Sequence, residues 1–243
     1  MRIVSWNIDS LKGGPEKIVA AVLHQQPTLV AFQEFPSGNK PGSNAVAVER
    51  MLATEGLVPF RREAKARPFR TIVFGPAETR LVAAPPELEG DDPFWVDVQF
   101  GGVGLSAAHI AIPQNAGLRE MHWRTALSLI ASKADTAHIL IGDLNTTRHG
   151  IDQEGATISG DHFLRTLEAA GWRDAWRATH AAPVPREYSW YYKKIGFKEI
   201  GFRFDQAWLS PALAPRLLGA RMNHEVREQG LSDHSMLVVE LDA

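Results

Sequence analysis

The apolar residues of this chain fall into many short runs of strand length and a few longer segments with helical spacing. Short apolar runs bounded by turn residues indicate β-strands, and apolar positions three or four residues apart indicate amphipathic helices. The pattern predicts strands over residues 2–8, 28–35, 57–63, 70–75, 94–100, 103–110, 138–145, 186–192, 202–210, 220–226 and 235–241. It predicts helices over residues 15–26, 44–56, 118–134 and 161–170.

Turn and capping residues agree with these element ends. Pro15 suits a first helical turn, Ser43 or Asn44 can cap the second helix, and Gly56 and Gly171 stop the helices that precede them. The connections between residues 57 and 110 are too short for crossover helices, so these strands should pair antiparallel. Because strands such as residues 28–35 are apolar throughout, both of their faces need cover. We therefore expect an α/β fold of two mainly antiparallel sheets with helices outside, forming one domain over residues 1–243.

Most of the apolar strands end in a polar residue that can do chemistry. A single polar residue at a strand end usually faces water or caps a turn. Here the strand ends carry a whole set of carboxylates, imidazoles and amides, and packed sheets gather their strand ends along one rim, where sites form. We take this set as the candidate site: Asn7, Glu34, His109, Asp143, Asn145, Asp205, Asp233 and His234.

The residue types in this set suggest metal-assisted hydrolysis. Glu34 and Asp233 offer hard carboxylate oxygens and Asn7 a neutral oxygen, a combination that favours Mg²⁺ or Mn²⁺ over Zn²⁺. Asp143 and Asn145 are two residues apart, so on an extended strand both side chains point to the same face. One of them can orient or deprotonate a water while the other contacts a substrate oxygen.

The histidines complete this chemistry. Asp205 can hold His234 in one tautomer and stabilise its charged form, and His109 and His234 can face a phosphate from two sides. Such a site hydrolyses phosphoesters mainly by charge stabilisation and positioning.

Composition and charge exclude some other classes of protein. The 243 residues carry a net charge of −2, which gives no global signature of nucleic-acid binding. The absence of cysteine excludes disulfides, thiolate metal sites and cysteine nucleophiles. The chain has no apolar run long enough to span a membrane, and its first residues lack the pattern of a signal peptide. We expect a monomeric, cytoplasmic protein.

The order of these motifs resembles the endonuclease/exonuclease/phosphatase superfamily. "SWNID", "FQE", "AAHI", "IGDLN", "YSW", "FRFD" and "SDH" follow one another from Asn7 to His234 as they do in deoxyribonuclease I, exonuclease III-type abasic-site endonucleases, sphingomyelinases and inositol polyphosphate 5-phosphatases. The resemblance covers nearly the whole chain. It implies a four-layer α/β/β/α sandwich and a Mg²⁺- or Mn²⁺-dependent phosphoester hydrolase.

The resemblance also implies residue roles. Glu34 looks like the metal site, with Asn7 nearby and Asp233 as a further acid close to the metal. Asp143 resembles the residue that activates the attacking water, and Asn145 the one that contacts phosphate. Asp205 and His234 look like the Asp–His pair of the family. His109 is similar to a histidine of deoxyribonuclease I and the sphingomyelinases.

Within the family, the segment from Tyr188 to Asp205 looks most like the exonuclease III branch. That branch carries a catalytic tyrosine near "IAIPQNAG", whereas the tyrosines of this chain are Tyr188, Tyr191 and Tyr192. The chain also reads "QEF" where the branch usually reads "QET".

Two further groups of residues are candidates for substrate contact. Arg61, Arg62, Lys65, Arg67 and Arg70 form either a phosphate-binding surface or a solvated hairpin. Trp190 with Lys193 and Lys194 can stack bases and hold a backbone, although Trp190 equally suits a core. We name Arg70, Trp190 and Lys193 as substrate-binding candidates. The remaining histidines have no motif around them and are taken as structural or exposed.

Three functions agree with these features. The first is a metal-dependent phosphodiesterase that acts on nucleic acid, most simply a DNA nuclease. The second is the same chemistry on a small-molecule or lipid phosphoester, which His109, the missing tyrosine and the acidic charge favour. The third, a binding module without activity, requires the loss of a catalytic residue, and no such loss is found.

Overall fold

The structure is a computed structural model that describes residues 1–37, 42–62, 67–83, 85–88, 92–154, 158, 160–180, 186–193 and 198–242. Lys65 and Lys194, two of the predicted phosphate-contacting residues, lie outside the described residues. No helix in the described part of the chain is both long and apolar enough to cross a membrane.

The first sheet has six strands in the order β13-β14-β1-β2-β4-β3. β1 and β2 are parallel because α1 crosses between them, and the other pairs are antiparallel. The bounds of these elements are β1 (Arg2–Asn7), α1 (Pro15–Leu23), β2 (Leu29–Pro36), β3 (Val58–Phe60), β4 (Phe69–Gly75), β13 (Leu217–Asn223) and β14 (Met236–Leu241).

The second sheet also has six strands, in the order β5-β6-β7-β8-β12-β9. β7 and β8 are parallel and are joined by the long helix α3, and the other pairs are antiparallel. The bounds are β5 (Arg80–Leu81), β6 (Trp95–Phe100), β7 (Val103–His109), α3 (Ala116–Lys133), β8 (His138–Asp143), β9 (Arg173–Asp174) and β12 (Asp205–Leu209).

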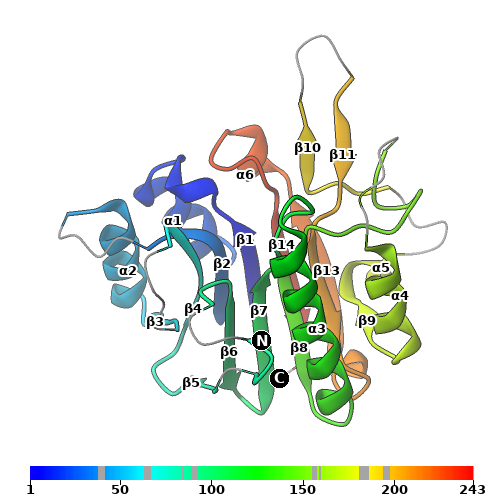
Figure 1. Cartoon of the computed structure of the whole chain (residues 1–243). Coiled ribbons are helices and arrows are strands. Elements are labelled where there is room, and N and C mark those ends of the chain that lie inside the picture. Colours follow the sequence, from blue (N-terminus) through cyan, green and yellow to red (C-terminus); the bar gives the residue numbers. More distant parts are fainter. Residues whose placement is uncertain are drawn as a thin grey trace.

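Three apolar clusters hold together the layers, whose arrangement is seen in Figure 1. One cluster, which includes Ile3, Val73, Leu105 and Ile141, lies between the two sheets. A second packs α1 and α2 (Asn44–Thr54) on the outer face of the first sheet, and a third packs α3 and α4 (Asp161–Ala169) on the outer face of the second. The predicted four-layer α/β/β/α sandwich is confirmed. Burial of the apolar strand faces on both sides is the main favourable contribution to this arrangement.

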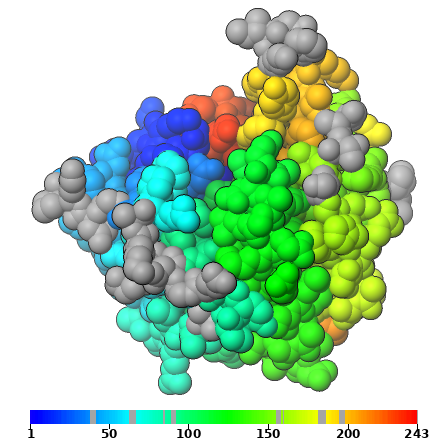
Figure 2. Space-filling view, viewed as in Figure 1, coloured from blue at the N-terminus to red at the C-terminus, as the bar shows by residue number. Residues whose placement is uncertain are grey.

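A short hairpin of β10 (Trp190–Tyr192) and β11 (Ile200–Phe202) stands outside both sheets. Figures 1 and 2 show it projecting from the end of the sandwich at which α6 (Glu225–Glu228) also lies. The remaining short helices are η1 (Asp9–Leu11), α5 (Ala175–Thr179) and η2 (Ala214–Arg216).

Several predicted strands were wrong in extent. Residues 186–192 form a strand only from Trp190, and the strand predicted over 202–210 is split between β11 and β12. The split occurs at Arg203, whose backbone N–H donates to the Asp152 carbonyl instead of to a strand partner. The strand predicted over 220–226 ends at Asn223, because the Asn223 side chain accepts from the N–H of Glu225 and starts a helical turn.

Candidate active site

Strand register brings the predicted polar residues to one rim of the sandwich. In the second sheet Asp143 at the end of β8 lies opposite His109 at the end of β7 and opposite Asp205 at the start of β12. Asn7 ends β1 in the first sheet, and its side chain reaches across to Asp143. The two sheets therefore both contribute residues to a single site. The sequence motifs indicated the order of these residues along the chain but not which of them are in contact.

Asp143 is the centre of this site. Its Oδ1 accepts from the Asn145 N–H at 3.0 Å, and its Oδ2 accepts from Asn7 Nδ2 at 3.1 Å. The Nε2 atoms of His109 and His234 lie 3.7 Å and 3.8 Å from the same Oδ2. A carboxylate that is buried, fixed from two sides and faced by two imidazoles is well placed to accept a proton from a water.

His234 is held in the charged form by Asp205. The Nδ1 of His234 lies 2.8 Å from Asp205 Oδ2, and both residues are buried. Burial opposes a charge on the imidazole, but the Asp205 carboxylate and its hydrogen bond outweigh burial and raise the pKa of His234 to about 10. At neutral pH His234 is therefore a cation that directs an N–H toward Asp143 and the cleft.

Two residues of the site adopt left-handed backbone conformations that are uncommon for side chains other than glycine. Glu34 has φ +52° within a bulge of β2, where the register with β4 shifts, and Asn145 has φ +44° just after β8. Bulges redirect side chains near active sites, and strain of this kind is concentrated at functional positions. The bulge turns Glu34 toward Asn7, whose Nδ2 donates to Glu34 Oε1 at 3.1 Å.

The carboxylates on the first-sheet side suit a hard divalent cation. Lys12 Nζ binds Asp9 Oδ2 at 2.7 Å, and the pKa of Lys12 is raised first by this hydrogen bond and further by the charges of Asp233 and Glu34. Within the described residues, no three acidic or histidine side chains converge closely enough to hold a metal alone. Mg²⁺ does not need such a cage, because it keeps several waters and takes one or two carboxylates with substrate phosphate.

Glu34, with Asp9 or Asp233, would hold such an ion. Sequence reasoning missed Asp9, although a signal was available: it ends the "SWNID" motif two residues after Asn7. Asn7 points its Nδ2 at Glu34 and Asp143, while its Oδ1 accepts from the Asp9 N–H. Asn7 thus links the candidate metal side to the water-activating side, and its role as a metal ligand stays a prediction.

A cleft of about 500 Å³ opens between the rim residues and the β10–β11 hairpin. Its polar lining includes Glu34, His109, Asp143, Asn145, Asp233 and His234. Its apolar lining comprises Ile112, Pro113, Ile158, Trp190, Tyr192, Ile200, Phe202 and Phe204.

We call Trp190, Phe202 and Phe204 the aromatic wall of this cleft. The rings of Phe202 and Phe204 are stacked with their centroids 5.1 Å apart, and Trp190 packs against both. The Trp190 indole N–H donates to Asp233 Oδ2 at 2.8 Å. Asp233 therefore anchors the wall.

A larger cavity of about 620 Å³ lies at the other end of β7 and β8. Its buried polar groups bind one another: Ser106 hydrogen-bonds Asp97, and His138 Nε2 lies 2.9 Å from Ser106 Oγ. Because none of the described residues that line this cavity belongs to the predicted set, we place the candidate chemistry in the smaller cleft.

The remaining substrate-contact candidates differ in position. Trp190 lines the cleft, but Arg70 binds Ser37 beside the β2 bulge, and Lys193 pairs with Glu199 on the hairpin at 3.0 Å. Neither Arg70 nor Lys193 is among the described residues that line the cleft.

Two buried residues that the sequence left unassigned support the rim. Arg119 of α3 donates to the Asn145 carbonyl at 2.8 Å and to Thr146 Oγ1 at 2.6 Å. His122 pairs with Asp92 at 2.8 Å, and its Nδ1 accepts from the N–H of Ala111. These contacts fix the segments that follow β7 and β8. No sequence motif marked either residue.

Comparisons with known proteins were made for the whole chain. No protein-family model and no curated protein matches the sequence. Three solved structures each match over 100% of both chains. They are a 3′ phosphatase from Neisseria bound to a product DNA hairpin (18% identity, TM-score 0.79), an AP endonuclease from Archaeoglobus fulgidus (16%, 0.82) and a 3′–5′ exonuclease from Neisseria meningitidis (19%, 0.79).

Likeness at these identities establishes the arrangement of the chain rather than its activity. All three structures match from end to end, so both sheets and their outer helices are included in the likeness. The chain therefore shares its overall fold with these three structures.

Proposed function

We propose that this protein is a phosphodiesterase that hydrolyses DNA with the help of Mg²⁺ or Mn²⁺. The observation that carries the proposal is the placement of Asp143, which is fixed by Asn7 and Asn145 and faced by His109 and His234 within 4 Å. The structural neighbours are a 3′ phosphatase bound to product DNA, an AP endonuclease and a 3′–5′ exonuclease, and these support DNA as the substrate.

The residues of the rim would divide the work of hydrolysis. A bound metal ion would neutralise phosphate charge, with Glu34 as its principal ligand. Asp143 would orient a water and accept its proton as the water oxygen attacks phosphorus. The bond between phosphorus and the leaving-group oxygen would then break, and that oxygen would take up a proton from solvent. His234, held as a cation by Asp205, would donate a hydrogen bond to a phosphate oxygen and stabilise the charge that develops there. His109 would contact the phosphate from the side opposite to His234.

A second substrate class is favoured by the composition of the cleft. Among the described lining residues there is no lysine or arginine, and most of the side chains are apolar. Such a lining suits one phosphate attached to an apolar or aromatic body. The same chemistry on a small-molecule or lipid phosphoester is therefore the second candidate.

Nicking of supercoiled plasmid tests the proposal. The wild-type protein is incubated with DNA and Mg²⁺ or Mn²⁺, beside an Asp143→Asn variant and a sample with chelator. We expect nicking by the wild type, and a loss of about 100-fold or more in the variant because the acceptor of the water proton is weakened. A folded protein that nicks no plasmid would reject an endonuclease that acts on intact DNA, and hydrolysis of bis(4-nitrophenyl) phosphate would then support the second candidate.

A further inference from the structure

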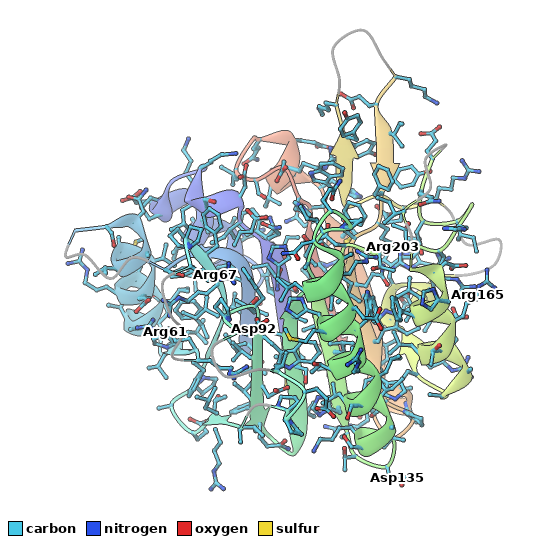
Figure 3. All side chains as sticks on the ribbon, viewed as in Figure 1. Arg61, Arg67, Asp92, Asp135, Arg165 and Arg203 are labelled. Carbon is cyan, nitrogen blue, oxygen red and sulfur yellow. The ribbon has the colours of Figure 1, made fainter. Side chains whose placement is uncertain are left out.

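A buried ionic cluster lies next to the aromatic wall. We define it as Asp152, Asp174, Arg177 and Arg203. Arg203 stands between Phe202 and Phe204 in the chain, but its side chain is absent from the cleft and only 1% exposed. Figure 3 labels it below the hairpin, on the side of the molecule that carries α4 and α5.

Each charge of the cluster has an opposite partner. Arg203 Nε donates to Asp152 Oδ1 at 2.7 Å, and its two terminal nitrogens donate to the Asp174 carboxylate. Arg177 binds Asp152 and lies 3.5 Å from Asp174. Burial opposes ionisation of Arg203, yet the two carboxylates raise its pKa, and the arginines hold the pKa of Asp152 below its ordinary value.

Stability alone is a weak reason for such a cluster. Removing charges from water costs free energy, and apolar residues of similar size often replace a buried ionic cluster without loss of stability. What apolar residues cannot supply is fixed geometry: the planar guanidinium binds carboxylates along set directions, so it defines position as well as contact.

The cluster joins the wall to the segment that follows Asp143 and Asn145. The Arg203 N–H donates to the Asp152 carbonyl at 2.8 Å, and Asp152 Oδ2 accepts from the Arg148 N–H. Gln153 forms a β-bridge with Phe202. The cluster and these main-chain contacts together tie the chain at Arg203, between two wall residues, to the segment that follows β8.

We propose that Arg203 is a positioning residue that sets the distance between the aromatic wall and Asp143, and so controls how tightly the cleft holds the group attached to the scissile phosphate. The inference rests on the proposed phosphodiesterase function. It assigns Arg203 no contact with substrate, because the guanidinium lies outside the cleft.

The test replaces Arg203 with lysine, which keeps the charge and loses the planar fork. KM and kcat are measured on a short DNA oligonucleotide and on bis(4-nitrophenyl) phosphate, whose aromatic groups can contact the wall. We expect KM to rise about 10-fold on an active substrate while kcat stays within about twofold, because Asp143, Asp205 and His234 keep their partners. Oligonucleotide binding by Asp143→Asn, with and without Arg203→Lys, gives the same comparison without turnover.

The matched control is Asp161→Asn. Asp161 binds Arg148 at 2.9 Å and Arg165 at 2.8 Å in the same region, and unlike Arg203 none of these three residues adjoins a wall residue in the chain. We expect this variant to leave KM and kcat unchanged, although it also removes ion pairs.

Two results would overturn the inference. A folded Arg203→Lys protein with unchanged KM would show that the cluster serves folding only, and a fall in kcat at constant KM would show that Arg203 acts through Asp205. If this variant fails to fold, Asp152→Asn, which keeps the Arg203–Asp174 bonds, is judged by the same criteria. Activity on bis(4-nitrophenyl) phosphate alone would reject DNA as substrate while still testing Arg203.

Discussion

His234 lies between two carboxylates, with Asp205 2.8 Å from its Nδ1 and Asp143 3.8 Å from its Nε2. Asp205 is completely buried, and in the described part of the chain its second oxygen has no hydrogen-bond partner. A buried carboxylate raises the pKa of His234 more than an exposed one would, because little water screens its charge. The charge of a single side chain at the rim thus depends on a partner that substrate does not touch.

Replacing Asp205 by asparagine should remove the cause of the raised pKa while preserving shape. We expect the pKa of His234 to fall from about 10 toward or below its ordinary value, since burial then dominates. Activity should drop about 100-fold at neutral pH. The variant should also lose activity as pH rises through 7, where the wild-type imidazolium is retained. Profiles of kcat/KM against pH for both proteins measure the difference, and superimposable profiles would contradict this role of Asp205.

His138, far from the rim, should make stability depend on pH. Burial, with a smaller effect from Lys133, lowers its pKa to about 4. Between about pH 4 and 6.5 the unfolded chain binds a proton that the folded chain does not, so stability is lost as pH falls through this window. The contribution is on the order of 3 kcal/mol, from the difference between the two pKa values.

Urea unfolding at pH 7 and pH 4.5 measures this effect, and a His138→Gln variant is the control. Asp97 contacts the same Ser106 hydroxyl as His138. Its pKa is raised, mainly by burial, so its contribution to stability increases as pH falls, opposite to that of His138. The difference between wild type and variant isolates His138. Equal losses of stability on acidification in both proteins would contradict the prediction.

At the scale of elements, the close approach of β7 and β8 puts His109 beside Asp143. Gly142, one residue before Asp143, has φ +147°, and a Cβ there would lie 1.9 Å from the Ala108 carbonyl oxygen. The "IGD" motif therefore needs glycine for a steric reason, because any side chain would push the two strands apart next to the site.

A Gly142→Ala variant should lose about 2 kcal/mol or more of stability, since neither the backbone angle nor the space admits a methyl group. Gly219 on β13 is the matched control, because a Cβ there meets no atom within 4 Å. We expect Gly219→Ala to change stability by about 0.5 kcal/mol at most. The denaturation midpoints of the two variants measure this difference in stability, and equal midpoints would contradict the steric argument.

The whole molecule concentrates negative charge on the first-sheet side of the rim. Lys12 binds Asp9 there, the charges of Glu34 and Asp233 raise its pKa further, and Asp143 lies across Asn7 from Glu34. Like charges held close together repel one another, so a divalent cation that binds the folded state should stabilise the protein.

We expect Mg²⁺ or Mn²⁺ to raise the melting temperature. At about 100 times the dissociation constant the gain is about 2.7 kcal/mol, which for a chain of this size corresponds to roughly 5–10 °C. Thermal melts with increasing metal measure the shift, and Glu34→Gln should largely abolish it. A melting curve of the wild type that does not respond to metal would count against this site.

Local sequence was enough to predict the architecture. Apolar strands covered on both faces require two sheets with outer helices, and that requirement acts through side chains a few residues apart. The chemistry of Asp143, His234 and Glu34 could likewise be anticipated, because each stands at the end of an apolar strand where a polar residue has no packing role. Errors arose where local pattern was overridden, as at Arg203, whose backbone N–H donates to the carbonyl of the distant Asp152 instead of to a strand partner.

Tertiary structure alone decided how these side chains meet. The register that sets His109, Asp143 and Asp205 side by side, the bulge that turns Glu34 toward Asn7, and the cluster around Arg203 all join residues far apart in the chain. Strand pairing and buried ion pairs depend on the packing of the entire sandwich, which no local pattern specifies. Residue types and their order along the chain thus named the candidate chemistry, while long-range packing set the distances at which it can operate.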